Sequence, residues 1–288
     1  MALTLSLPRA WTVTDELVAS VPGLEPDELQ RLRQRVVSEL TPLAAELPEG
    51  VRLVLDGYRY RLAVRQPEQC AERAGPFTPS PAACRRAIGV VAVDRCLRRR
   101  AVGPADAVAQ VLAAGAEDAR RSEEGDGSRA PWWARWYAEL GPGGRAAVAA
   151  EATTWATQLW TALAWDRIPP PVVIGGRHDW WDLPGQRLTL RSRAEVRAQV
   201  DRRAVLAVVL SGAPDGTSRS ELSFVALVSA LAGGARSAPG RVLGLWPAAG
   251  QVRVVPVGAR ALEVAADELL SATATWVDAL IEQRGRGT

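Results

Sequence analysis

Apolar residues recur at helical spacing along much of this chain. In residues 26–43, Leu29, Leu32 and Val36 fall on one face, behind a proline that suits the first turn of a helix. The same spacing predicts further helices within 77–100 and at 103–119, 145–165, 220–234 and 259–283. The chain is therefore expected to be rich in amphipathic helices.

Shorter apolar runs predict strands. Residues 51–64 alternate apolar and polar positions around Asp56-Gly57, a pattern typical of a β-hairpin. After Pro171, the runs PVVIGG, QRLTLRSRAEVRA and RRAVLAVVLSG precede a helix, and RVLGLW and QVRVVPV follow it. From residue 145 the order is helix, strands, helix, strands, helix. That order predicts the α/β class, with a mixed β-sheet flanked by helices.

A polar segment without apolar periodicity, residues 120–130, predicts a linker. We therefore expect two regions. Residues 1–119 would form an N-terminal helical region, α+β in class, that carries the hairpin at 51–64. Residues 131–288 would form the α/β domain.

The basic and sulfur-containing residues exclude several kinds of site. All 35 residues counted as lysine or arginine are arginine, and His178 is the single histidine. Mechanisms that need a lysine, and zinc sites of several histidines, are therefore excluded. Cys70, Cys84 and Cys96 lack metal-ligand spacing and fit buried thiols in a reducing compartment, so we expect a cytoplasmic protein. No apolar run reaches the length of about 18 residues that a membrane span needs.

Three acidic residues in the C-terminal half stand in a recognisable order. Glu195 lies in SRAEV, thirteen residues before the start of VVLSG at 208–212; Glu221 opens ELSFVAL, and Glu151 lies on the long helix. In this order and spacing, residues 142–283 resemble the RecB-like branch of the PD-(D/E)XK nuclease superfamily. That family reads as a helix bearing an acid, a strand with G-R-I-D, a strand ending D-x-K-T-G, a helix opening Q-x-x-x-Y, and a closing strand pair and helix.

The resemblance implies a metal site that this chain does not complete. Glu195 takes the place of the aspartate, Gly212 matches the terminal glycine, and Glu221 replaces the glutamine. Cleavage in this family needs two or three carboxylates on Mg²⁺ and a lysine beside them. The D-x-K positions, which share one side of the strand, hold Val208 and Leu210. We therefore expect a catalytically inactive nuclease-fold protein, without metal or cofactor, that binds nucleic acid or a protein partner.

Two other functions stay open. A divergent Mg²⁺-dependent DNA nuclease would use Glu151, Glu195 and Glu221, with the strand acid moved to the following helix. A structural or assembly subunit would instead use residues 1–119 as its contact surface. These functions differ in whether the three acids meet around one metal ion.

Arginines are the candidates for contact with nucleic acid, because phosphate binding depends on positive charge. The candidate set is Arg98, Arg99, Arg100, Arg193, Arg197 and Arg219. The first three equally fit a solvated helix end that the helix dipole stabilises. Arg193 and Arg197 flank Glu195, and either could simply pair with it.

The aromatic residues allow two interpretations. The eleven tryptophans could stack bases of a single strand, or they could anchor cores and interfaces. HDWWD at 178–182 predicts a turn before a strand, with its tryptophans at the edge of the core.

The family resemblance also implies a geometry. Residues 188–197 and 204–211 should be neighbouring strands of one sheet, with the 220–232 helix packed across it. Val208 and Leu210 should then share a face in an aliphatic layer near Glu195.

Overall fold

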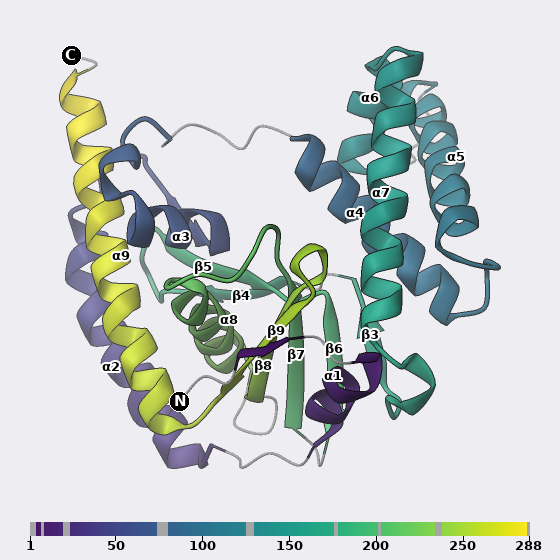
Figure 1. The fold of residues 1–288 in the computed structure, drawn as a ribbon. Coiled ribbons are helices and arrows are strands. Elements are labelled where there is room, and N and C mark those ends of the chain that lie inside the picture. The colour runs from purple at the N-terminus through teal and green to yellow at the C-terminus, as the bar shows by residue number, and fades with distance from the viewer. Residues whose placement is uncertain are drawn as a thin grey trace.

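The fold was analysed in a computed structural model (Figure 1). The structure describes residues 4–6, 9–19, 24–73, 80–124, 130–175, 178–200, 203–233 and 238–286.

The largest element is a six-stranded mixed sheet with the strand order β1-β9-β8-β7-β6-β3. Neighbouring strands are antiparallel except β7 and β8, which are parallel. The strands span Thr4–Ser6 (β1), Gln251–Pro256 (β9), Pro239–Trp246 (β8), Arg203–Val209 (β7), Val196–Val200 (β6) and Val172–Ile174 (β3). The parallel pair is possible because helix α8 (Ser218–Ala232) carries the chain from β7 back to the start of β8.

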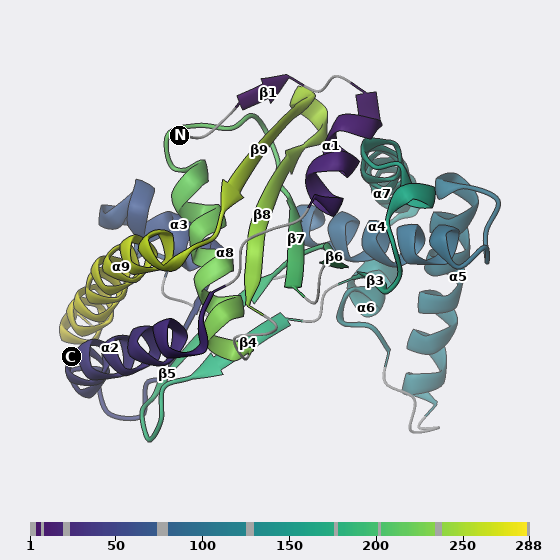
Figure 2. The ribbon, with the colours of Figure 1, turned by 90° about the horizontal axis from the view of Figure 1, so that it is seen from below.

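Helices cover both faces of this sheet, and alternation along β7 separates the two cores. Leu206 and Val208 point into the core formed with α8, α9 (Ala259–Arg286) and α2 (Pro26–Ala45). Val205 and Val209 point into the opposite core, formed with α1, α4, α5 and α7. These helices span Arg9–Val18 (α1), Pro81–Leu97 (α4), Pro104–Glu123 (α5) and Pro142–Ala162 (α7). Figure 2 shows the resulting three layers, which confirm the coarse α/β class.

A second, three-stranded sheet has the order β2-β5-β4 and spans Leu53–Asp56, Leu188–Arg193 and His178–Asp182. β2 runs parallel to β5, and β4 runs antiparallel to it. Helix α8 packs against β4 and β5 on one side of this small sheet. Leu188 and Leu190 belong to the same core as α8.

The predicted hairpin at 51–64 is wrong. Asp56-Gly57 does not form a turn between strands, because Asp56 is the N-cap of helix α3 (Gly57–Arg65). Its side chain accepts hydrogen bonds from the backbone N–H groups of Tyr58 (3.1 Å) and Arg59 (3.0 Å). The strand before the cap pairs with β5, from the other half of the chain.

The predicted linker at residues 120–130, which would divide the chain into two regions, is also wrong in its described part. Helix α5 continues through Glu123, and residues 125–129 lie outside the described residues. The two halves share both sheets, because β1 pairs with β9 and β2 pairs with β5. Arg35 on α2 also forms ion pairs with Glu263 and Asp267 on α9. Residues 1–119 are therefore interleaved with the rest of the fold rather than forming a region beside it.

The long helices α2, α4, α5, α7, α8 and α9 lie where apolar spacing places them, with ends shifted by a few residues. Gly89 on α4 permits the close contact of α4 with α7, since a Cβ there would lie 2.4 Å from the Trp155 ring. Shorter helical segments span Pro67–Gln69, Trp132–Glu139 (α6), Trp165–Arg167 and Pro247–Ala249. Among the described residues, no helix combines the length and apolarity that crossing a bilayer requires.

Candidate functional site around Glu195

Glu195 lies where the chain passes from the small sheet into the large one, between β5 and β6. Its backbone N–H donates to the Ala207 carbonyl (2.9 Å), and its carbonyl accepts from the Gly175 N–H (3.1 Å). These bonds extend the β3-β6-β7 ladder by one residue and fix the position of Glu195. Of the strand predicted at 188–197, residues 196–197 lie beside β7 as the start of β6, whereas 188–193 form β5 in the other sheet, so the prediction is wrong for most of its length.

The Glu195 carboxylate is completely buried and accepts from several donors. Oε1 accepts from Arg86 Nε (2.7 Å) and Nη2, and lies 3.3 Å from Arg193 Nε. Oε2 accepts from the backbone N–H of Val209 (2.7 Å), which caps the end of β7. The expected partner Arg193 is present, but the main partner, Arg86 on α4, was not predicted. Arg197 instead contacts Asp179 (2.5 Å).

Val208 and Leu210, at the two positions that the resemblance aligns with D-x-K, pack against the same apolar core, as expected. Val208 is 4% exposed and lies in the core that also contains Leu222 of α8, while Leu210 is partly buried. A carboxylate or an ammonium group here would enter an apolar layer rather than a metal site.

The structure does not bring Glu151, Glu195 and Glu221 together around one metal. Glu151 is half-exposed and paired with Arg85 (2.9 Å). Glu221 is buried in the first turn of α8, where Arg61 Nη1 lies 3.4 Å from its carboxylate. Burial raises the pKa of Glu221, and the charges of Arg61 and Arg65 only partly oppose that effect. In the described parts of the chain no three His, Cys, Asp or Glu side chains form a metal-binding group. The residues present therefore do not fit a Mg²⁺ centre.

The surroundings of Glu195 carry an excess of positive charge, because Arg86 and Arg193 share one carboxylate. Burial, and then the like charges of Arg86 and Arg191, lower the pKa of Arg193 to about 10. Burial likewise lowers the pKa of His178 to about 4, with Arg191, Arg193 and Arg86 acting in the same direction. These three arginines thus make the surroundings of His178 electrostatically positive.

The Glu195 centre, which consists of Glu195, Arg86 and Arg193, adjoins one exposed face of the small sheet. We define this outer face as His178, Trp180, Arg191 and Arg193. In the β4–β5 register His178 lies opposite Arg193, and Trp180 lies opposite Arg191. The Arg191 guanidinium lies 5.3 Å from the Trp180 ring centroid and pairs with Asp56 (2.9 Å). The prediction of a turn at 178–182 is wrong, because these residues form strand β4.

The remaining candidate arginines lie elsewhere. Arg98, Arg99 and Arg100 are exposed at the end of α4, with Arg98 about 18 Å along the helix axis from Arg86. Arg98 pairs with Asp94 (2.8 Å), and Arg99 adopts a left-handed backbone conformation (φ 54°). Arg219 is exposed on the first turn of α8. Arg98–Arg100 are therefore a surface feature separate from the Glu195 centre.

The three cysteines are free and buried. Burial raises the pKa of all three thiols, that of Cys84 to about 11, which keeps them protonated and unreactive near neutral pH.

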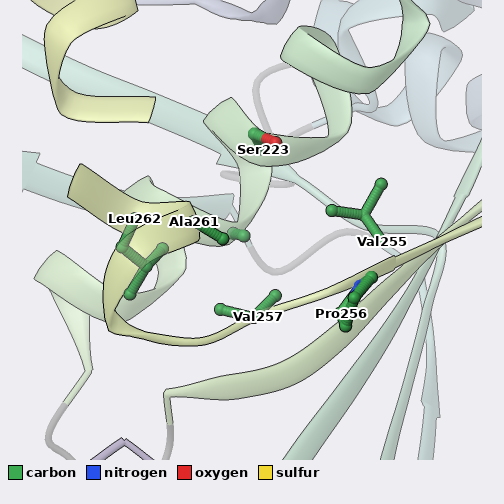
Figure 3. A pocket seen from close by; sticks show the side chains of 7 residues that line it. Ser223, Val255, Pro256, Val257, Ala261 and Leu262 are labelled. Carbon is green, nitrogen blue, oxygen red and sulfur yellow. The ribbon is translucent and has the colours of Figure 1, made fainter. Parts of the chain in front are cut away.

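A hollow between α8, β9 and the start of α9 offers no comparable chemistry (Figure 3). Its lining is apolar apart from Ser223, and it has no room for a water molecule. The lining residues are Ser223, Ala226, Val255, Pro256, Val257, Ala261 and Leu262.

Comparisons with protein-family models, with curated proteins and with solved structures gave no match.

Proposed function

We propose that the protein is a catalytically inactive relative of the RecB-like PD-(D/E)XK nucleases that binds nucleic acid at the arginine centre around Glu195. The observation that carries the proposal is the set of partners of Glu195. Where a nuclease would place a metal ion against this carboxylate, Arg86 donates to it and Arg193 forms an ion pair with it. The order of elements supports the relationship: α7 with Glu151, Glu195 before β6, Val208 on β7, then α8, the β8–β9 pair and α9.

The charges around Glu195 favour an anionic ligand. Two guanidinium groups share one carboxylate, and Arg191, which is paired with Asp56, lies on the same side of the small sheet. A phosphate group would reduce the repulsion among these arginines, because guanidinium groups bind phosphate oxygens with paired, charge-assisted hydrogen bonds. Arg86 and Arg193 keep more than a quarter of their side-chain surface exposed, so phosphate can reach them.

Binding is tested with the full chain and labelled single-stranded DNA, double-stranded DNA and single-stranded RNA, with and without Mg²⁺ or Mn²⁺. We expect binding without cleavage. Three phosphate contacts to a single strand predict about a 20-fold loss of affinity between about 50 and about 200 mM salt. Salt-insensitive binding, or no binding at the lower salt concentration, would contradict the proposal.

The variant Glu195→Gln separates binding from catalysis. The amide oxygen of the substituted side chain can still accept from the Val209 N–H, whereas the negative charge beside Arg86 and Arg193 is removed. We expect tighter binding of nucleic acid, because both guanidinium groups are freed for phosphate. Glu151→Gln, at an exposed acid paired with Arg85, is the matched control and should not change affinity. Metal-dependent cleavage by the wild-type chain that disappears in Glu195→Gln would support the divergent nuclease instead.

A further inference from the structure

Trp180 is a large aromatic residue that is exposed to solvent. It lies on β4, at the edge of the small sheet, and half of its surface (50%) is open to solvent. Large aromatic side chains contribute most to stability when they are buried, so an exposed indole has a weak structural role. The next residue, Trp181, points to the other face and packs against the core. Trp181 therefore packs in the core, whereas Trp180 is available for another contact.

The groups around Trp180 are those that bind nucleotides. The Arg191 guanidinium lies over the Trp180 ring, 5.3 Å from its centroid, and the centroid of the His178 ring lies 6.1 Å away, with the two rings tilted by 32°. Arg193 lies two residues beyond Arg191 on β5 and therefore on the same face of the sheet. A flat aromatic surface thus lies beside two arginines whose Cα positions are about 7 Å apart along the strand.

We propose that the outer face of the small sheet binds single-stranded nucleic acid, with one base stacked on Trp180 and adjacent phosphates bound by Arg191 and Arg193. This inference rests on the proposed function and specifies its ligand. In a duplex the base faces are covered by their neighbours, whereas a single strand can turn a base onto an exposed ring. The shared carboxylate of Glu195 leaves Arg86 and Arg193 with one positive charge in excess, which a phosphate complements.

The decisive experiment measures fluorescence anisotropy of a labelled single strand, a duplex of the same length, and a single strand carrying a run of abasic sites. The full chain is compared with Trp180→Ala, Trp180→Phe and Trp132→Ala. Trp132 on α6 is a matched control, since it is exposed to a similar extent (48%) on a different layer of the molecule.

We expect Trp180→Ala to weaken binding to the normal single strand by about 5- to 150-fold, the effect of losing one stacked base. Trp180→Phe should recover most of the affinity, because a phenyl ring also stacks. Trp132→Ala should bind like the wild type. On the abasic strand, wild type and Trp180→Ala should bind equally, because only phosphate contacts remain; a purely structural role of Trp180 would lower affinity for every probe.

The possible failures are distinguishable. If the wild type binds none of the probes, the proposed function itself is wrong. If the wild type binds nucleic acid in a salt-dependent way but Trp180→Ala binds the single strand normally, base stacking is wrong and the proposed function stands. A loss of equal size on single strand, duplex and abasic strand also overturns the stacking inference.

Discussion

The two faces of the small sheet carry opposite kinds of residue, although the same strand supplies both. On β5, Leu188 and Leu190 point inward and are at most 1% exposed against α8. Arg191 and Arg193, which alternate with Leu190 and the buried Ser192, point outward. Alternation along a strand explains how one short segment can serve a core and a surface at once.

The two faces differ in how far folding stability explains their residues. The inner face is explained by the hydrophobic effect alone, because each of its leucines removes apolar surface from water. The outer face is not, since Arg193 is desolvated beside Arg86 and Arg191, all of the same charge. Burying a guanidinium near others opposes folding unless partners compensate for it. Glu195 is such a partner for Arg193, and Asp56 is one for Arg191. The proposed binding role would use the one positive charge that remains in excess beside Glu195.

The largest expected effect on the free energy of unfolding comes from placing a charge in the core behind the inner face. Val208→Asp should destabilise the protein by more than about 3 kcal/mol, because it buries a carboxylate without a partner. Urea unfolding followed by circular dichroism measures the change. Val264→Asp, at a half-exposed position on α9, is the control and should stay within about 0.5 kcal/mol of the wild type. A Val208→Asp variant that remains stable and gains Mg²⁺-dependent cleavage would contradict our interpretation of this core.

A cavity in the inner face should have a large effect on stability and none on affinity. Leu190→Ala removes a fully buried side chain and should cost about 2–5 kcal/mol of unfolding free energy. The folded variant should bind single-stranded DNA like the wild type, since the outer face keeps its residues. Titration below the unfolding temperature tests this. A selective loss of binding, with little loss of stability, would show that the two faces are not separable.

The smallest expected effect is the pH dependence contributed by His178 on the outer face. Its pKa in the folded protein is about 4, below the ordinary value of 6.5, so the folded state favours the neutral ring. Besides burial, the groups that act on it are Arg191, Arg193 and Arg86, which lower the pKa, and Asp56, which raises it. In the unfolded chain the ring binds a proton below about pH 6.5, so stability falls as the pH drops from there toward 4.

His178→Gln removes this titration. Unfolding curves at about pH 7 and at about pH 4.5 should show a smaller loss of stability for the variant than for the wild type. An equal loss in both proteins would mean that burial and the arginines together do not lower the pKa of His178 in the folded state.

The sequence predicted the helices better than the partners of the strands. Apolar spacing is a local property, and it located α2 and α8. Asp56-Gly57 misled because the same dipeptide suits a hairpin and a helix N-cap, and only the pairing of β2 with β5 decides between them. For Glu195, the neighbouring Arg193 was predictable as a partner, whereas Arg86 lies 109 residues away and meets it only through the packing of α4. Trp180 and Trp181 differ in exposure only because of the face that each occupies.

The pairing of early strands with late ones has a consequence for how the chain is made. β1 pairs with β9 through Thr4 and Arg253, and β2 pairs with β5 through Leu53 and Leu188. While a ribosome is still synthesising the second half, the partner strands of β1 and β2 do not yet exist. Their apolar residues then stay exposed to solvent or make non-native contacts. Chains dominated by such distant pairings fold slowly and are prone to aggregate before they are complete. Arrest of translation before β5 should therefore leave a nascent chain that chaperones bind and proteases cut, with α4 and α5 formed but neither sheet assembled.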